Sequence, residues 1–189
     1  MTLSDAAVVA LACDGDSEAF RALVERHGRA VFRLAHRMTG SRADAEDIVQ
    51  ETFIRAYRQL NRFESRASFG TWIHRIAVNC AIDLLRSRGG HQEAAYDDEL
   101  LKEPTLERGT PRDPSPERLT LSREVRDAVQ NAMARLSPLE RAAFVLRHFE
   151  GRSHDEIGQT LGLATSATKH SVFRAVRKMR LALAPFIES

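Results

Sequence analysis

The sequence lacks several features that would define common protein classes. No apolar run approaches the roughly 20 residues that cross a bilayer, and the N-terminus shows no basic segment followed by an apolar core, so we expect no secretory signal. There are only two cysteines, Cys13 and Cys80, and they stand too far apart for metal-ligand spacing. We expect two buried thiols in the reducing cytosol, and hence a cytoplasmic protein.

Signatures of catalysis are also missing. The sequence contains no G-x-S-x-G, no phosphate-cradling glycine-rich loop and no H-E-x-x-H, and its seven histidines show no motif spacing. We therefore expect no enzyme, no catalytic residue, no cofactor, no metal and no small-molecule substrate.

What is present is an uneven distribution of charge and proline. The net charge of +2 combines +2 over residues 1–90, −4 over 91–118 and +4 over 119–189. Four of the six prolines fall inside the acidic stretch, which is poor in periodic apolar residues and so cannot offset its ordering entropy. We predict domains over 1–88 and 117–189, joined by a flexible acidic, proline-rich linker over 89–116.

The N-terminal module shows the 3–4 spacing of amphipathic helices and no sustained strand alternation. One helix is predicted from Asp16 or Ser17 to Gly40. A second starts near Ser41, with carboxylates in its first turn, and its buried stripe is predicted to include Tyr57. A third is predicted over about 68–86. The fold class is therefore all-α, with two small helical domains.

The C-terminal module is punctuated more clearly. Ser137 to Glu140 fits a capping box with proline at the first helical position, and Ser153 to Glu156 fits a second. A short helix after Ser153 is followed by the turn Gly162-Leu163-Ala164 and a longer helix. This spacing is typical of a helix-turn-helix, whose second helix enters the DNA major groove.

Charge agrees with nucleic-acid binding in this segment. No Asp or Glu occurs between Ile157 and Ile187, whereas five cations do. A face of one sign suits a phosphate backbone, where affinity arises mainly from counterion release. The alternative is an ordinary helical hairpin with a solvated basic face. The five cations are Lys169, Arg174, Arg177, Lys178 and Arg180.

A second candidate surface lies on the predicted helix after Ser41. Asp47, Gln50, Glu51 and Ile54 share the face opposite the apolar stripe. An isoleucine among acids suggests a protein contact with a polar rim. The alternative is a solvated helix face with one stray apolar residue.

A third candidate surface mixes aromatic residues with arginines between Phe63 and Arg86. Such a mixture suits unstacked single-stranded bases, because every base offers a π-face and a phosphate. Asn79 could read a base edge, since its amide both donates and accepts. The alternative is that Trp72 and Phe69 fill the core.

Four segments occur in an order that resembles one family: DAEDIVQETFIRAY (44–57), FGTWIHRIAVNCAIDLLR (69–86), LSPLERAAFVLRHFEGRSHDEIGQTLGL (136–163) and FRAVRKMR (173–180). Together they resemble the extracytoplasmic-function (ECF) sigma factors of the sigma-70 superfamily, the compact sigma subunits of bacterial RNA polymerase. The likeness covers nearly the whole chain outside the predicted linker.

The resemblance implies two DNA-binding helical domains, region 2 and region 4, and partners that comprise core RNA polymerase, promoter DNA and an anti-sigma factor, often membrane-anchored. It assigns Asp47, Gln50, Glu51 and Ile54 to the surface that docks on polymerase. It assigns −10 element binding to Phe63, Ser65, Arg66, Ala67, Ser68, Trp72, Arg75, Asn79 and Arg86, and −35 element binding to Arg147, Lys169, His170, Phe173, Arg174 and Arg177.

One stretch of the sequence departs from the family pattern, and one rival interpretation of the whole chain stays open. The stretch entering the second helix of the motif is Ser166-Ala167-Thr168-Lys169-His170-Ser171, where many members carry Gly-Thr-Val-Lys-Ser-Arg, so the −35 preference could differ. The rival interpretation is a self-sufficient helix-turn-helix regulator, which would bind its operator tightly without polymerase.

Overall fold

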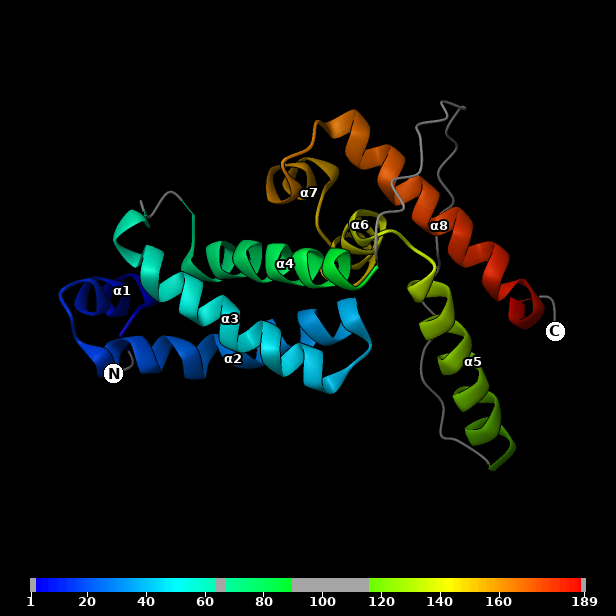
Figure 1. Cartoon of the computed structure of the whole chain (residues 1–189), viewed down its shortest axis with the longest axis horizontal. Helices are drawn as coiled ribbons and strands as arrows, with labels where there is room; N and C mark the ends of the chain where they lie inside the picture. The colour runs from blue at the N-terminus through cyan, green and yellow to red at the C-terminus, as the bar shows by residue number, and fades with distance from the viewer. Residues whose placement is uncertain (1–2, 64–66, 90–115, 188–189) are drawn as a thin grey trace. The chain divides into compact units, whose positions relative to one another are not determined.

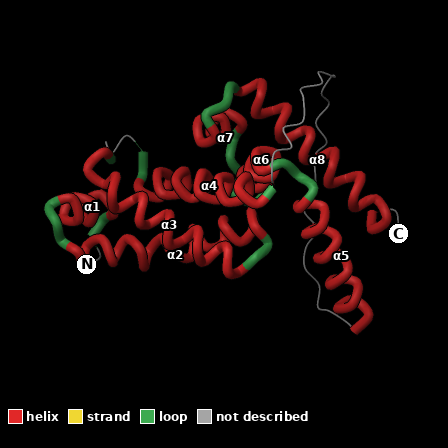
Figure 2. Tube along the Cα trace, viewed as in Figure 1, coloured by secondary structure: helices red, strands yellow, loops and turns green. Residues whose placement is uncertain are grey.

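The computed structural model describes residues 3–63, 67–89 and 116–187, and these contain helices and loops without a strand (Figure 2). They belong to two compact units. The first contains α1 (Asp5–Cys13), α2 (Ser17–Thr39), α3 (Arg42–Gln59), the 3-10 turn η1 (Leu60–Arg62) and α4 (Phe69–Arg88). The second is built on α5 (Pro116–Ala134), α6 (Pro138–His148), α8 (Thr165–Ile187) and most of α7 (His154–Leu161). The predicted all-α class is confirmed.

The first unit is a bundle in which α2, α3 and α4 lie side by side (Figure 1). Helices α2 and α3 begin at the predicted caps. Asp16 accepts from the amides at the start of α2, Ser41 does so for α3, and Gly40 ends α2 in the left-handed conformation at φ 70°. Side chains at helical spacing then meet in one core. Its fully buried members include Leu23, Leu34, Met38, Phe69 and Ile73.

Three local details differ from the sequence-based expectations. Tyr57 was expected in the buried stripe, but it is 57% exposed. Cys13 was expected to be buried, but only Cys80 is, while Cys13 is exposed. Helix α1 was not predicted, because DAAVVALAC is apolar on nearly every side and has no polar face to set a period.

The second unit packs α8 against α5 and α6. Glu140 holds α6 to α8: it completes the predicted capping box with Ser137, and its buried carboxylate lies 2.7 Å from Lys178 Nζ and 3.5 Å from Arg174 Nε. Such burial of a carboxylate is tolerated only with charged or hydrogen-bonding partners. The box at Ser153 and Glu156 is also present, with N–O distances of 2.8 and 3.2 Å.

The predicted linker falls mostly outside the described residues. α4 ends at Arg88 and α5 begins at Pro116. The domain boundaries at 88, 89, 116 and 117 stay predictions.

Candidate nucleic-acid and protein interfaces

An aromatic cluster stands at the start of α4. Phe63, Phe69 and Trp72 form a triangle with ring centroids 5.2 to 6.0 Å apart. Phe69 is buried, as the core alternative proposed, whereas Phe63 and Trp72 are half-buried and keep part of each ring accessible. Ser68 caps the helix by accepting from the Thr71 amide at 3.2 Å. The capped helix start therefore fixes the cluster beside the segment that the family resemblance assigns to base capture.

The remaining −10 candidates occupy two places. Arg75, Asn79 and Arg86 are exposed along one side of α4, at spacings of four and seven residues that keep them on one face. Ala67 is exposed directly before the Ser68 cap. Ser65 and Arg66 lie outside the described residues.

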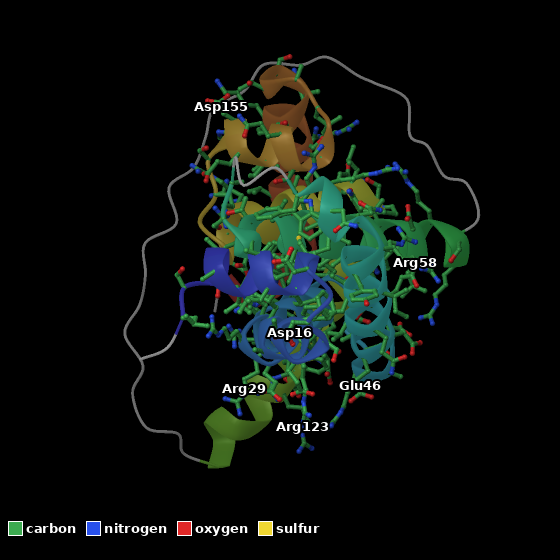
Figure 3. The ribbon with its side chains drawn as sticks, turned by 90° about the vertical axis from the view of Figure 1, so that its left-hand side faces the viewer. Asp16, Arg29, Glu46, Arg58, Arg123 and Asp155 are labelled. Atoms are coloured by element: carbon green, nitrogen blue, oxygen red, sulfur yellow. The ribbon has the colours of Figure 1, made fainter. Side chains whose placement is uncertain are left out.

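On α3, the structure separates the four predicted docking residues by their surroundings. Asp47, Gln50 and Ile54 are exposed, and Ile54 exposes 45% of its surface. Glu51 is instead engaged within the chain, because it accepts from Arg55 Nε at 2.6 Å. Figure 3 labels Glu46 and Arg58, which lie on the exposed side of the same helix near its start and its end.

Ile54 continues into an apolar groove that sequence reasoning missed. The groove is lined by Phe20 of α2 together with Phe53, Ile54, Tyr57 and Arg58 of α3. The rings of Phe20 and Tyr57 meet edge to face at 4.9 Å. The spacing of three residues between Ile54 and Tyr57 was the available signal, because it places both side chains on one helix face.

The helix-turn-helix is held together by close approach and by one side-chain contact. The Leu163 amide donates to the Gly158 carbonyl at 2.9 Å. A Cβ on Gly158 would lie 2.7 Å from the Leu163 carbonyl oxygen and 3.1 Å from Thr168 Oγ1. The Thr165 hydroxyl donates to Asp155 at 2.7 Å, which joins the first turn of α7 to the first turn of α8. Asp155 itself is exposed (Figure 3).

The −35 candidates on α8 differ in how much of each side chain is exposed. Lys169 and Arg177 are exposed, His170 and Phe173 are half-buried, and Arg174 is half-buried against Glu140. Arg174 therefore has a role inside the fold as well as its predicted place in the DNA reader. Arg147 lies on α6 and donates to the Arg152 carbonyl at 3.1 Å, which fixes the loop before α7.

His27 lies beside a carboxylate, with its Nε2 2.8 Å from Asp5 Oδ2. Burial lowers the pKa of His148, with a further contribution from the charge of Arg147. Over the described ranges, no group of His, Cys, Asp or Glu side chains could hold a metal ion. No helix in those ranges is long and apolar enough to span a membrane.

Comparison with known proteins defines the class. The family model for sigma-70 region 2 matches residues 23–90, and that for sigma-70 region 4 matches residues 126–179. The ECF sigma-E factor of Escherichia coli K12 is 35% identical over 174 residues, which cover 92% of this chain and 91% of that protein. SigE of Mycolicibacterium smegmatis is 36% identical over 158 residues, which cover 84% of this chain and 59% of that longer protein.

This protein belongs to the ECF sigma factors of the sigma-70 family. The family is non-enzymatic, and its region 4 is a DNA-binding helix-turn-helix, so the expected class and the expected lack of enzyme activity are both confirmed. Solved structures agree in fold. CnrH bound to the cytosolic domain of CnrY has a TM-score of 0.63 at 28% identity, and the alignment covers 96% of this chain and 97% of that one. RpoE of Bartonella quintana bound to the anti-sigma factor NepR has a TM-score of 0.59 at 21% identity, covering 87% and 96%.

Proposed function

We propose that this chain binds core RNA polymerase through the exposed face of α3 and directs it to promoters. The four contact residues are Asp47, Gln50, Glu51 and Ile54. The apolar groove beside Ile54 supports the assignment, because an apolar centre with an acidic rim is typical of a specific protein interface. Arg55 holds Glu51, so that carboxylate is already oriented before a partner arrives.

The −10 element is bound by α4 and the segment before it. Flipping a base costs a few kcal/mol, and stacking on aromatic rings returns roughly 1–3 kcal/mol per base. The part-accessible rings of Phe63 and Trp72 supply that stacking, Asn79 reads a base edge, and Arg75 and Arg86 hold the backbone. The family resemblance assigns Ser65, Arg66, Ala67 and Ser68 to the same element.

The −35 element is bound as a duplex by α8. The exposed Lys169 and Arg177 and the half-buried His170, Phe173 and Arg174 face the groove, and Arg147 contacts a phosphate. Phosphate contacts fix the register, and side chains on base edges specify the sequence. Membership in the ECF family over 92% of the chain is the observation that carries this function.

Regulation follows from the same family. We propose a cytoplasmic sigma factor that is covered by a membrane-anchored anti-sigma factor. Two proteins of similar fold support this: CnrH was solved with the cytosolic domain of CnrY, and RpoE with the anti-sigma factor NepR.

The test is promoter binding with and without core polymerase. Genomic fragments are mixed with the purified chain alone, with core alone and with both. Tight, sequence-specific retention only in the combined sample is the expected result. Equally tight retention by the free chain would instead indicate a self-sufficient regulator.

A further inference from the structure

The proposed DNA-facing side of α4 contains an acidic residue that does not suit it. Asp83 lies four residues after Asn79 and three before Arg86, so it shares their helix face. Its side chain is 55% exposed. A carboxylate in that place would repel the phosphates that Arg75 and Arg86 attract.

Arg55 compensates this charge from the neighbouring helix. Its Nη1 donates to Asp83 Oδ2 at 3.1 Å, and its Nε donates to Glu51 Oε1 at 2.6 Å. The guanidinium presents several donors in one plane and so holds two carboxylates in a fixed arrangement. Its hydrogen bonds, first to Glu51 and then to Asp83, raise the pKa of Arg55 further above its usual range.

The contribution of these ion pairs to folding stability is too small to explain why the network is there. Exposed ion pairs are worth about 0–1 kcal/mol, and the side chains of Glu51, Arg55 and Asp83 are all more than one-third accessible. Beneath them the bundle is already closed by Thr52 and Cys80, which are both buried. The electrostatic effect on the α4 surface is the larger consequence, because phosphate binding responds to each charge on that surface.

We propose that Arg55 is a positioning residue for promoter binding, which neutralises Asp83 and so keeps the Arg75–Arg86 face of α4 attractive to DNA. The inference rests on the proposed function, since it requires α4 to face the −10 element. Arg55 does not need to touch DNA in this role. Its effect is exerted through Asp83.

This role predicts that two neutralising substitutions change the promoter affinity of the holoenzyme in opposite directions. Arg55→Gln leaves Asp83 uncompensated, and holoenzyme affinity for promoter DNA should fall by roughly tenfold. Asp83→Asn removes the repulsion and should raise that affinity a few-fold. The double variant should return to wild-type affinity or above it, because the charge that Arg55 compensates is gone.

The measurement uses holoenzyme assembled from purified core polymerase and the full chain. The probe is a labelled genomic fragment that supports run-off transcription by the wild-type holoenzyme, and dissociation constants are taken at several salt concentrations. Arg42→Gln is the matched control. Arg42 pairs with Glu46 at the same i, i+4 spacing on the same helix, at 2.9 Å and on an exposed surface, and the structure gives it no carboxylate partner on α4.

Three results would overturn the proposal. A double variant as weak as Arg55→Gln would mean that Arg55 contacts a phosphate itself. Weaker binding by Asp83→Asn alone would mean that the carboxylate reads a base, as an acceptor for cytosine N4. Because Arg55 also holds Glu51, core binding is measured separately, and a loss of core affinity by Arg55→Gln with unchanged promoter affinity of the assembled holoenzyme would mean that Arg55 acts only through the polymerase interface. If wild-type holoenzyme retains no genomic fragment, the proposed function itself fails, which is a separate outcome.

Discussion

Replacing Gly158 by alanine tests the geometry of the helix-turn-helix. Alanine favours a helix interior over glycine by about 1 kcal/mol, so in an open position the change would stabilise α7. Here the new Cβ would lie 2.7 Å from the Leu163 carbonyl oxygen and 3.1 Å from Thr168 Oγ1. The first atom is backbone, so it cannot move without opening the turn that Leu163 closes by donating to Gly158.

The expected net effect is a loss of stability. Overpacking of this kind costs about 1–3 kcal/mol, which exceeds or cancels the gain in helix propensity. We expect Gly158→Ala to lower the free energy of unfolding of the second unit by up to about 2 kcal/mol. Promoter binding should weaken with it, because α8 would no longer be held at its angle to α7.

The assay exploits the single tryptophan. Trp72 lies in the first unit, so its fluorescence reports denaturant unfolding of that unit, whereas far-UV circular dichroism reports helices in both. Gly158→Ala should move a circular dichroism transition to lower denaturant and leave the Trp72 transition unchanged. Gly28→Ala is the control: beyond its own stretch of helix, nothing lies within 4 Å of the added Cβ, so it should stabilise the first unit by about 0.5–1 kcal/mol. If Gly158→Ala stabilised the chain as Gly28→Ala does, the close approach would be refuted.

Three further predictions concern the proposed interfaces, and a fourth concerns the stability of the second unit. Asn79→Ala should lower promoter-dependent transcription yet leave core binding intact, and lost core binding in a pull-down would contradict its role. The double reversal Asp47→Lys and Glu51→Lys should abolish co-elution with core polymerase at unchanged helix content, whereas full activity would show that the face is merely solvated. Arg174→Ala should weaken −35 duplex binding by about 1–3 kcal/mol if the side chain reaches a base edge, and unchanged affinity in a titration would remove it from the reader. Because burial lowers the pKa of His148 below its ordinary 6.5, the unfolded state takes up the proton first. The second unit should therefore lose stability as pH falls below about 6.5, and an equal pH slope in His148→Gln would refute this cause.

Local signals explain why much of the fold could be predicted. The caps at Asp16, Ser41 and Ser137 depend only on neighbouring residues in the sequence, because an N-cap and the amides it binds are at most three positions apart. Helix periodicity likewise located the cores. It could not decide how far a stripe is covered, which is why Tyr57, at the edge of the α3 stripe, was wrongly expected to be buried.

Contacts between distant residues could not be predicted in this way. Glu140 meets Lys178 across 38 residues, and Arg55 meets Asp83 across 28. The spacing of residues within one helix does not indicate which residue of another helix each will contact. The close approach at Gly158 could not be predicted either. A glycine inside a helix pattern indicates that close contact is possible there, but it does not identify the group that makes the contact. The roles of the interface residues were suggested by family resemblance rather than by these physical patterns.

The central claim is that this chain gives core RNA polymerase its starting positions. Mapping transcript 5′ ends on genomic templates, with core polymerase alone and with the chain added, measures that directly. We predict a new set of starts that appears only with the chain, preceded by two shared sequence elements, and that is lost with Asn79→Ala. Transcript ends that stay the same with and without the chain would contradict the account.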